Sequence, residues 1–141
     1  MIRLSRRTLL GLAMLAVATG ALRPVAAKAA ALPKARLAGL EATLRALLPK
    51  GIAIARIGHL YLASAKLDSQ GLTRTLRLVQ GFGAPDTMQA DADRERIATR
   101  IRHDFERDRL VAVDGWILAR TEARLCAICV LASAPEAGAG E

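Results

Sequence analysis

Residues 110–132 read LVAVDGWILARTEARLCAICVLA, and this stretch decides the fold of the C-terminal part of the chain. Two apolar runs flank Asp114-Gly115, a dipeptide that favours a type I′ turn because both central positions of that turn need a positive φ. We therefore expect a two-stranded hairpin over residues 110–118. Residues 121–132 follow as a strongly apolar run, and we expect them to form a buried last helix.

Upstream of the hairpin, apolar residues recur at helical spacing. Leucines at intervals of three and four residues predict an amphipathic helix over residues 37–48, which Pro49-Lys50-Gly51 ends. Residues 52–66 are apolar around most of their circumference, so we expect a central and largely buried helix there. Ser69 is a candidate N-cap for a third helix, which carries apolar residues at helical spacing.

Residues 91–109 predict a further helix, the most polar one, with a narrow core stripe made of Ile97, Ile101 and Phe105. Alternating Val-Ile-Thr runs are few, and Ala and Leu dominate the apolar content, which favours helices. The sequence therefore predicts a mainly α fold, a small bundle of four to five helices with one short β-hairpin before the C-terminal helix.

The N-terminus has the pattern of an export signal. Two adjacent arginines precede an apolar run that is too short to span a bilayer stably. This pattern resembles the twin-arginine signal, which exports folded proteins across the bacterial inner membrane. An ordinary secretory signal with paired arginines and an uncleaved N-terminal anchor are the alternatives. The residues that carry the expected twin-arginine signal are Ser5, Arg6, Arg7, Leu9 and Leu10.

Ala27-Lys28-Ala29 is the best small-x-small cleavage site. We therefore expect a signal peptide over residues 1–29, a single helical domain over residues 30–133 and a flexible tail over residues 134–141. This division predicts a periplasmic protein with no stable membrane span after cleavage. During export the twin-arginine translocase would be its transient partner.

Charge and composition exclude nucleic acid as a partner. The chain carries 21 Lys and Arg against 13 Asp and Glu, but five of the basic residues precede residue 30. The expected mature chain keeps 16 basic and 13 acidic residues, a net charge of only +3. Aromatic side chains for base stacking are almost absent as well.

Two groups of residues near the C-terminus are candidates for function. Trp116, Arg120, Glu122 and Arg124 form the densest mixture of polar and aromatic groups, and we interpret them as a candidate partner surface. The structural alternative, which we favour, is that Trp116 fixes the hairpin to the core and that Glu122 caps the helix or pairs with an arginine.

The second candidate is the Cys126-x-x-Cys129 pair, which could act in redox chemistry or metal binding. Reactive cysteines lie at a helix N-terminus, where the helix dipole lowers the thiol pKa, whereas this pair falls inside a predicted helix. Buried free thiols that pack like small apolar residues are therefore the favoured interpretation. The sequence offers no four-thiolate metal site, and we expect no cofactor.

The segment V-D-G-W-x-L-x-x-T-E-A-R-L at residues 113–125 resembles the closing segment of a group of short bacterial proteins with twin-arginine signals. Ile57-Gly58-x-x-Tyr61-Leu62 and Ile101-Arg102-x-Asp104-Phe105 add to this resemblance. More loosely, the organisation of the chain, an export signal followed by a small helical domain, resembles small subunits of periplasmic dehydrogenases such as gluconate dehydrogenase. That resemblance implies a helical, cofactor-free chain that carries the export signal on behalf of a flavoprotein, and no site residue transfers from it.

These observations predict an exported, non-catalytic accessory protein or small subunit. Its partner would be a larger protein that is exported together with it. The resemblance to small dehydrogenase subunits implies that this partner is an oxidoreductase. The alternative from a different class is a thiol-based redox or metal-binding periplasmic protein that uses the cysteine pair. A free-standing ligand-binding bundle is the third hypothesis, which a sizeable apolar pocket would favour.

Overall fold

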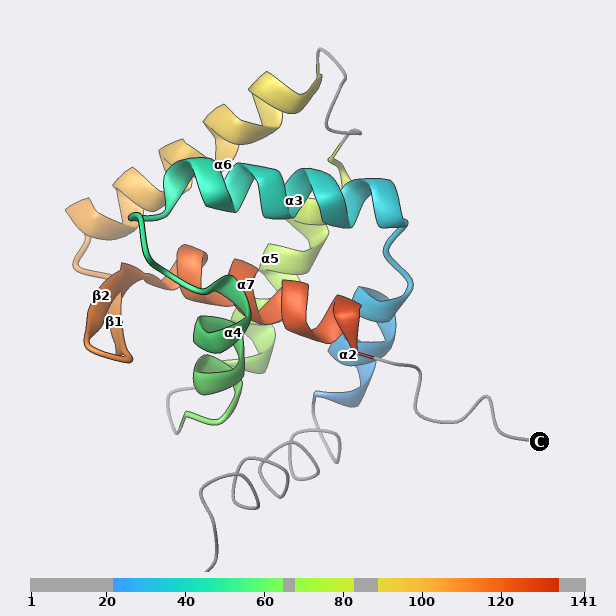
Figure 1. The fold of residues 1–141 in the computed structure, drawn as a ribbon, viewed down its shortest axis with the longest axis horizontal. Helices are drawn as coiled ribbons and strands as arrows, with labels where there is room; N and C mark the ends of the chain where they lie inside the picture. The colour runs from blue at the N-terminus through green and yellow to red at the C-terminus, as the bar shows by residue number, and fades with distance from the viewer. Residues whose placement is uncertain (1–21, 65–67, 83–88, 135–141) are drawn as a thin grey trace, which may run out of the picture.

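A computed structural model describes residues 22–64, 68–82 and 89–134 of the chain. Within these residues, six helices and one hairpin follow one another along the chain (Figure 1). The elements are α2 (Arg23–Ala30), α3 (Lys34–Leu47), α4 (Ile54–Leu62), α5 (Ser69–Gln80), α6 (Gln89–Glu106), β1 (Leu110–Val113), β2 (Trp116–Ala119) and α7 (Arg120–Ser133). The predicted mainly α bundle with a hairpin before its last helix is confirmed.

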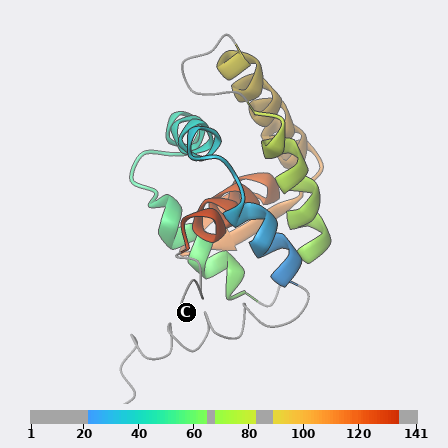
Figure 2. The ribbon, with the colours of Figure 1, turned by 90° about the vertical axis from the view of Figure 1, so that its right-hand side faces the viewer.

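Helix α7 lies at the centre of the molecule. It packs against each of the other helices and against both strands, most extensively against α4. Figures 1 and 2 show it enclosed by the other elements. Ten of its 14 residues are buried, which explains why its sequence is apolar on every side from Leu125 to Ala132. The expectation that residues 52–66 form the central helix is wrong, because α4 keeps one face exposed and covers α7 from outside.

Helix α4 approaches α7 closely at Gly58. A Cβ atom placed on Gly58 would lie 2.6 Å from Cγ2 of Val130 and 2.8 Å from the carbonyl carbon of Cys126. Real Cβ atoms essentially never lie within 3.0 Å of another group. The absence of a side chain at Gly58 is therefore what lets the two helices pack at this distance.

Local signals set the end of α3 and the start of α5, with one correction. Helix α3 ends at Leu47, directly before the predicted stop at residues 49–51. At the start of α5, the N-cap is Asp68 and not Ser69, because the Asp68 carboxylate accepts a hydrogen bond from the Gly71 N–H at 3.0 Å. Ser69 is the first residue of the helix instead.

Helix α6 carries a shorter core stripe than its sequence predicts. Ile97 is fully buried and Ile101 is half-buried, but Phe105 is 48% exposed, so its expected place in the core is wrong. The last turn of α6 is anchored instead by Asp104, which is buried. An amphipathic pattern therefore identifies the inward face of α6 but not the point at which that face leaves the core.

Helix α2, apart from Ala30, falls within the segment that we expected the signal peptidase to remove. Pro24 lies in its first turn, where a missing N–H costs no hydrogen bond. Leu22, Val25 and Ala29 are buried, and the helix packs against α5 and α7. The rest of the expected signal, residues 1–21, lies outside the described residues. Among the described helices, none combines the length and the apolar character needed to cross a membrane.

Candidate functional site

The hairpin between α6 and α7 forms the centre of the candidate partner surface. Its strands pair antiparallel with Val113 opposite Trp116, so the two-residue turn is Asp114-Gly115. Asp114 has φ +53° and Gly115 has φ +80°, as the predicted type I′ turn requires. Aspartate tolerates this left-handed region better than most residues do, and glycine enters it freely.

An ion pair fixes the hairpin turn to helix α4. The Arg56 guanidinium contacts both carboxylate oxygens of Asp114, with Nε 2.7 Å from Oδ2 and Nη2 3.0 Å from Oδ1. Because this bidentate arrangement constrains both partners, it holds the turn more firmly than a single contact at the surface would. The hairpin is therefore braced at its tip by α4 as well as at its base by the helices on either side.

The two faces of the hairpin differ in burial. Val111, Val113 and Leu118 lie on the inner face and are buried against the core. Trp116 shares that inner face by its register but remains 37% exposed at the tip, so it is only partly fixed to the core. Ile117 lies on the outer face and is 67% exposed. The hairpin thus presents two large apolar side chains to solvent on a rigid support.

Two carboxylates accept hydrogen bonds from backbone N–H groups at the N-terminus of α7. Glu122 accepts a hydrogen bond from the Ala119 N–H at its Oε2 atom, at 2.7 Å. Asp104 of α6 accepts two hydrogen bonds from Thr121 at its Oδ2 atom, one from the backbone N–H at 2.9 Å and one from the hydroxyl at 2.7 Å. Unpaired N–H groups in the first turn of a helix need such acceptors. These carboxylates therefore join α6, the hairpin and α7.

Glu122 does not share the solvent-facing surface with Trp116. It is 5% exposed, and its role in the structure is the cap on Ala119 that we had considered as the structural alternative. Burial raises the pKa of Glu122 above its ordinary value, and the nearby Asp104 carboxylate raises it further. The hydrogen bond from the Ala119 N–H acts in the opposite direction and lowers this pKa.

Arg120 and Arg124 lie one turn apart on α7 and line the same small cavity. The Arg124 guanidinium lies 3.0 Å from Oδ2 of Asp68, the residue that caps α5. Its side chain is only 16% exposed, and it occupies the space that a side chain at Gly71 would need. Arg120 is exposed, and both arginines line a small cavity of about 190 Å³ with Tyr61. Arg124 therefore mainly links α7 to the start of α5, whereas the exposed Arg120 side chain makes no ion pair with another described residue.

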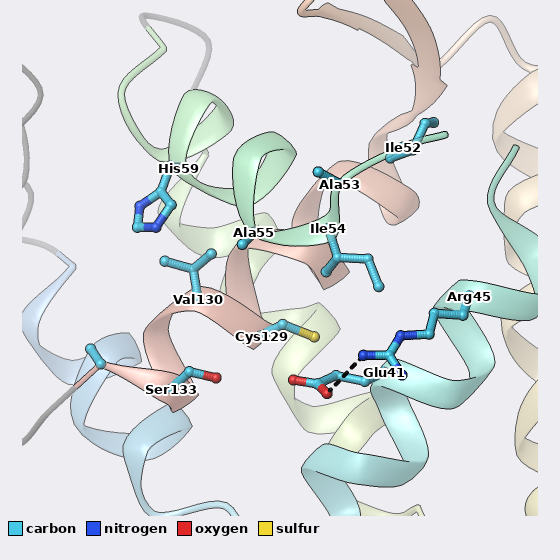
Figure 3. Close-up of a pocket in the computed structure, with 11 residues that line it drawn as sticks. Glu41, Arg45, Ile52, Ala53, Ile54, Ala55, His59, Cys129, Val130 and Ser133 are labelled. Atoms are coloured by element: carbon cyan, nitrogen blue, oxygen red, sulfur yellow. Dashed lines mark ion pairs between the residues drawn. The ribbon is translucent and has the colours of Figure 1, made fainter. Parts of the chain in front are cut away.

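A larger cavity of about 570 Å³ lies between α3, α4 and the C-terminal end of α7 (Figure 3). Apolar side chains line most of it, and Figure 3 shows Ile54 and Cys129 directed toward the Glu41–Arg45 pair on α3. The closest charged atoms of that pair are 3.9 Å apart. His59 lies at the opposite end of the cavity from this pair (Figure 3). The volume falls within the range of small-molecule sites.

Both cysteines lie in the middle of α7, and Cys129 lines the larger cavity. Cys126 is 0% and Cys129 is 4% exposed, and both are free thiols. Burial raises the pKa of Cys126 to about 12, and the Glu122 carboxylate adds to the shift. Burial likewise raises the pKa of Cys129, with additional contributions from Cys126 and Glu41. Nucleophilic thiols need the opposite shift, so these cysteines match buried packing residues.

The two histidines occupy different settings. His59 is half-buried on α4, where it lines the larger cavity. His103 is exposed on α6, and its Nδ1 atom lies 2.7 Å from Nη2 of Arg109. Among residues 22–64, 68–82 and 89–134, no group of three or more His, Cys, Asp and Glu side chains is placed to hold a metal ion.

Sequence reasoning missed three residues of this region. Ile117 could have been found, because strand alternation around the Asp114-Gly115 turn places it on the face opposite Trp116. Arg56 and Asp104 carry no local signal, since each meets its partner across a long separation in the chain. The predicted export residues Ser5 to Leu10 lie outside the described part of the chain.

A comparison of the chain with protein-family models, with curated proteins and with solved structures finds no match.

Proposed function

We propose that this chain is an exported accessory subunit that binds a larger partner protein through its hairpin. The observation that carries the proposal is the exposure of Trp116 and Ile117 on a hairpin whose turn is tied to α4 by Arg56. Large aromatic and apolar side chains contribute most of the energy at protein interfaces. A rigid support lowers the entropy that a partner contact must overcome.

Charge around the hairpin fits a partner surface with acidic groups at its rim. Arg120 is exposed at the start of α7, directly after β2. The Arg56 side chain is 67% exposed although it pairs with Asp114. A partner would therefore place an apolar pocket against the hairpin tip and carboxylates around it.

In this proposal the paired arginines Arg6 and Arg7 direct export by the twin-arginine route. Because that route carries folded proteins, the chain would bind its partner in the cytoplasm and take it to the periplasm. The resemblance to small dehydrogenase subunits points to a larger oxidoreductase as the partner. The chain itself would supply binding and export, and the partner would supply the reaction.

Affinity purification of the tagged chain from periplasm tests the proposal. We expect one larger protein to co-purify in a fixed ratio. Ile117→Thr keeps a β-branched residue in the strand and Trp116→Ala removes the aromatic ring; both should lose most of the partner while the circular dichroism stays unchanged. Phe105→Ala, which removes an exposed aromatic ring from α6, is the matched control and should retain the partner. A monomer exported alone would contradict the proposal.

The larger cavity supports a second candidate function, the binding of a small apolar ligand. Its volume of about 570 Å³ and its mostly apolar lining are the specific observation. An environment-sensitive dye such as anilinonaphthalene sulfonate should bind there and fluoresce. Ala55→Phe, which adds a ring to the exposed wall of the cavity, should abolish that signal without lowering thermal stability. An unchanged signal would place the dye elsewhere and remove this candidate.

The thiol-based alternative requires a cysteine that reacts in the native protein. The raised pKa of Cys126 and the burial of both thiols favour the structural interpretation over this alternative. The rate of thiol labelling in the native and in the unfolded protein separates the two.

A further inference from the structure

The small cavity of about 190 Å³ lies between the C-terminal end of α4, the start of α5, strand β1 and the first half of α7. It shares none of its lining residues with the larger cavity of Figure 3. The residues that line it are Tyr61, Asp68, Leu110, Val111, Arg120 and Arg124. At about 30 Å³ for each water molecule, this volume has room for about six non-hydrogen atoms. A small organic molecule therefore fits the cavity.

Three side chains of this cavity keep hydrogen-bond donors that they do not use within the fold. Nε of Arg124 is buried and has no acceptor in the described part of the chain, although Nη2 of the same side chain lies 3.0 Å from Oδ2 of Asp68. The exposed Arg120 side chain makes no ion pair with another described residue. The Tyr61 hydroxyl makes no hydrogen bond within residues 22–64, 68–82 and 89–134, although this residue is only 2% exposed. Buried donors without acceptors are unfavourable, so this arrangement favours a ligand that accepts several hydrogen bonds.

The charge of the cavity favours an anion with a single negative charge. Two arginines stand against one aspartate, which leaves a net charge of +1. Asp68 is ionised at neutral pH, because the hydrogen bond from the Gly71 N–H lowers the pKa of its carboxyl group and the charge of Arg124 lowers it further. A dianion such as phosphate would therefore bring an excess negative charge close to the Asp68 carboxylate.

The remaining wall of the cavity is apolar. Leu110 and Val111 of β1 line it, and Val111 is 6% exposed. Apolar side chains around a few placed donors are the usual composition of a small-molecule site. Guanidinium groups match the planar geometry of a carboxylate, and a short carbon chain would contact the two apolar side chains.

We propose that this cavity binds a carboxylate group carried on a short apolar chain. Arg120 and Nε of Arg124 donate to the carboxylate oxygens, the Tyr61 hydroxyl donates a further hydrogen bond, and Leu110 and Val111 pack against the chain. The site lies apart from the exposed side chains of the hairpin tip, so it does not depend on the proposed function. A free short-chain acid and an acidic side chain of a bound protein both supply this chemistry.

Isothermal titration calorimetry of the purified full chain with sodium butyrate, at constant ionic strength, tests the proposal. Butyrate has the size of the cavity and carries one negative charge. We expect saturable binding of butyrate. Butan-1-ol, which has the same chain without the charge, and inorganic phosphate, which has the charge without the chain, should bind much more weakly.

Two conservative variants assign the binding to this cavity. Arg120→Gln and Tyr61→Phe should each weaken butyrate binding about tenfold, because each removes a hydrogen bond to a charged group. Both should fold normally, since Arg120 is exposed and phenylalanine keeps the buried ring. Arg77→Gln is the matched control, because it removes an exposed arginine from the other end of α5 and should leave the affinity unchanged.

Four results would overturn the proposal. They are no binding of butyrate, equal binding of butan-1-ol, tighter binding of phosphate, and an affinity for butyrate that either cavity variant leaves unchanged. Calorimetry needs no partner protein, so failure of the proposed function would not affect this result.

The source of the carboxylate is determined with the tagged chain and its co-purifying partner. Sodium butyrate that releases the partner, where sodium chloride of the same concentration does not, would assign the site to an acidic side chain of the partner. Retention of the partner, with butyrate binding to the chain, would assign the site to a free acid. Both results support a carboxylate site, whereas an assembly without any butyrate binding to the free chain would contradict it and leave the proposed function intact.

Discussion

Replacement of Gly58 by alanine should destabilise the fold at the contact between α4 and α7. The added methyl group would lie 2.6 Å from Cγ2 of Val130, and it must retreat by about 0.8 Å to reach the 3.4 Å at which ordinary van der Waals contact begins. It would also meet the backbone carbonyl group of Cys126. A carbonyl group in a central helix cannot rotate away, and the β-branched side chain of Val130 has one strongly preferred rotamer.

The expected loss follows from two opposing effects. Overpacking of a tight core costs about 1–3 kcal/mol, and the two rigid obstacles place Gly58→Ala near about 3 kcal/mol. Alanine gains about 1 kcal/mol over glycine in a helix interior. The net change in the free energy of unfolding is therefore a loss of about 2 kcal/mol. For a domain of this size, that loss lowers the melting temperature by about 8 °C.

Urea denaturation followed by circular dichroism measures this change, and Gly81→Ala is the matched control. Gly81 has an ordinary negative φ of −86°, and a Cβ atom there would lie 3.6 Å from the Leu78 carbonyl oxygen. The control should be neutral or more stable by about 0.5 kcal/mol, because alanine restricts the unfolded chain. Equal stability of the two variants would refute the close approach of α4 and α7.

Three further predictions concern buried groups of α6 and α7. Asp104→Ala leaves two Thr121 donors without an acceptor and should cost about 2–3 kcal/mol in urea denaturation, whereas Asp104→Asn keeps an acceptor and should cost less. The raised pKa of Glu122 means that the native state binds its proton more tightly, so this stabilising contribution is present below pH 4.5 and is lost as the pH rises through the native pKa. The free energy of unfolding, measured from pH 4 to pH 8, should therefore fall for the unaltered chain relative to Glu122→Gln as the pH rises. The same pH dependence in both proteins would contradict the assignment. Cys126 and Cys129 should react slowly with a thiol reagent at pH 8 and rapidly in urea, because both are buried and have raised pKa values; rapid native labelling would show reactive thiols.

The confirmed predictions depend on local chemistry. The Asp114-Gly115 turn follows from the φ values that two adjacent positions must adopt, and it holds in the structure. The stop after Leu47 follows from a proline and a glycine nearby. Such preferences act between residues close in sequence, so they can be found without knowledge of the rest of the fold.

The corrected predictions depend on contacts between distant segments. Phe105 continues the apolar stripe of α6 and yet is 48% exposed, because the neighbouring elements cover only part of that helix. Residues of α4 and α7 are both strongly apolar, and only the packing shows that α7 is the helix that all others surround. Glu122 has the same sequence pattern as a surface residue, but its carboxylate turns inward to the Ala119 N–H.

The sequence by itself determined the fold class, the hairpin and its turn, and the apolar C-terminal helix, because periodicity and turn conformation arise within short segments. Tertiary structure alone decided which helix is central, that Arg56 braces the hairpin, that Asp104 closes the start of α7, and that α2 belongs to the core. Each of these depends on atoms brought together from distant parts of the chain. Burial and pairing of that kind have no signature in any single segment.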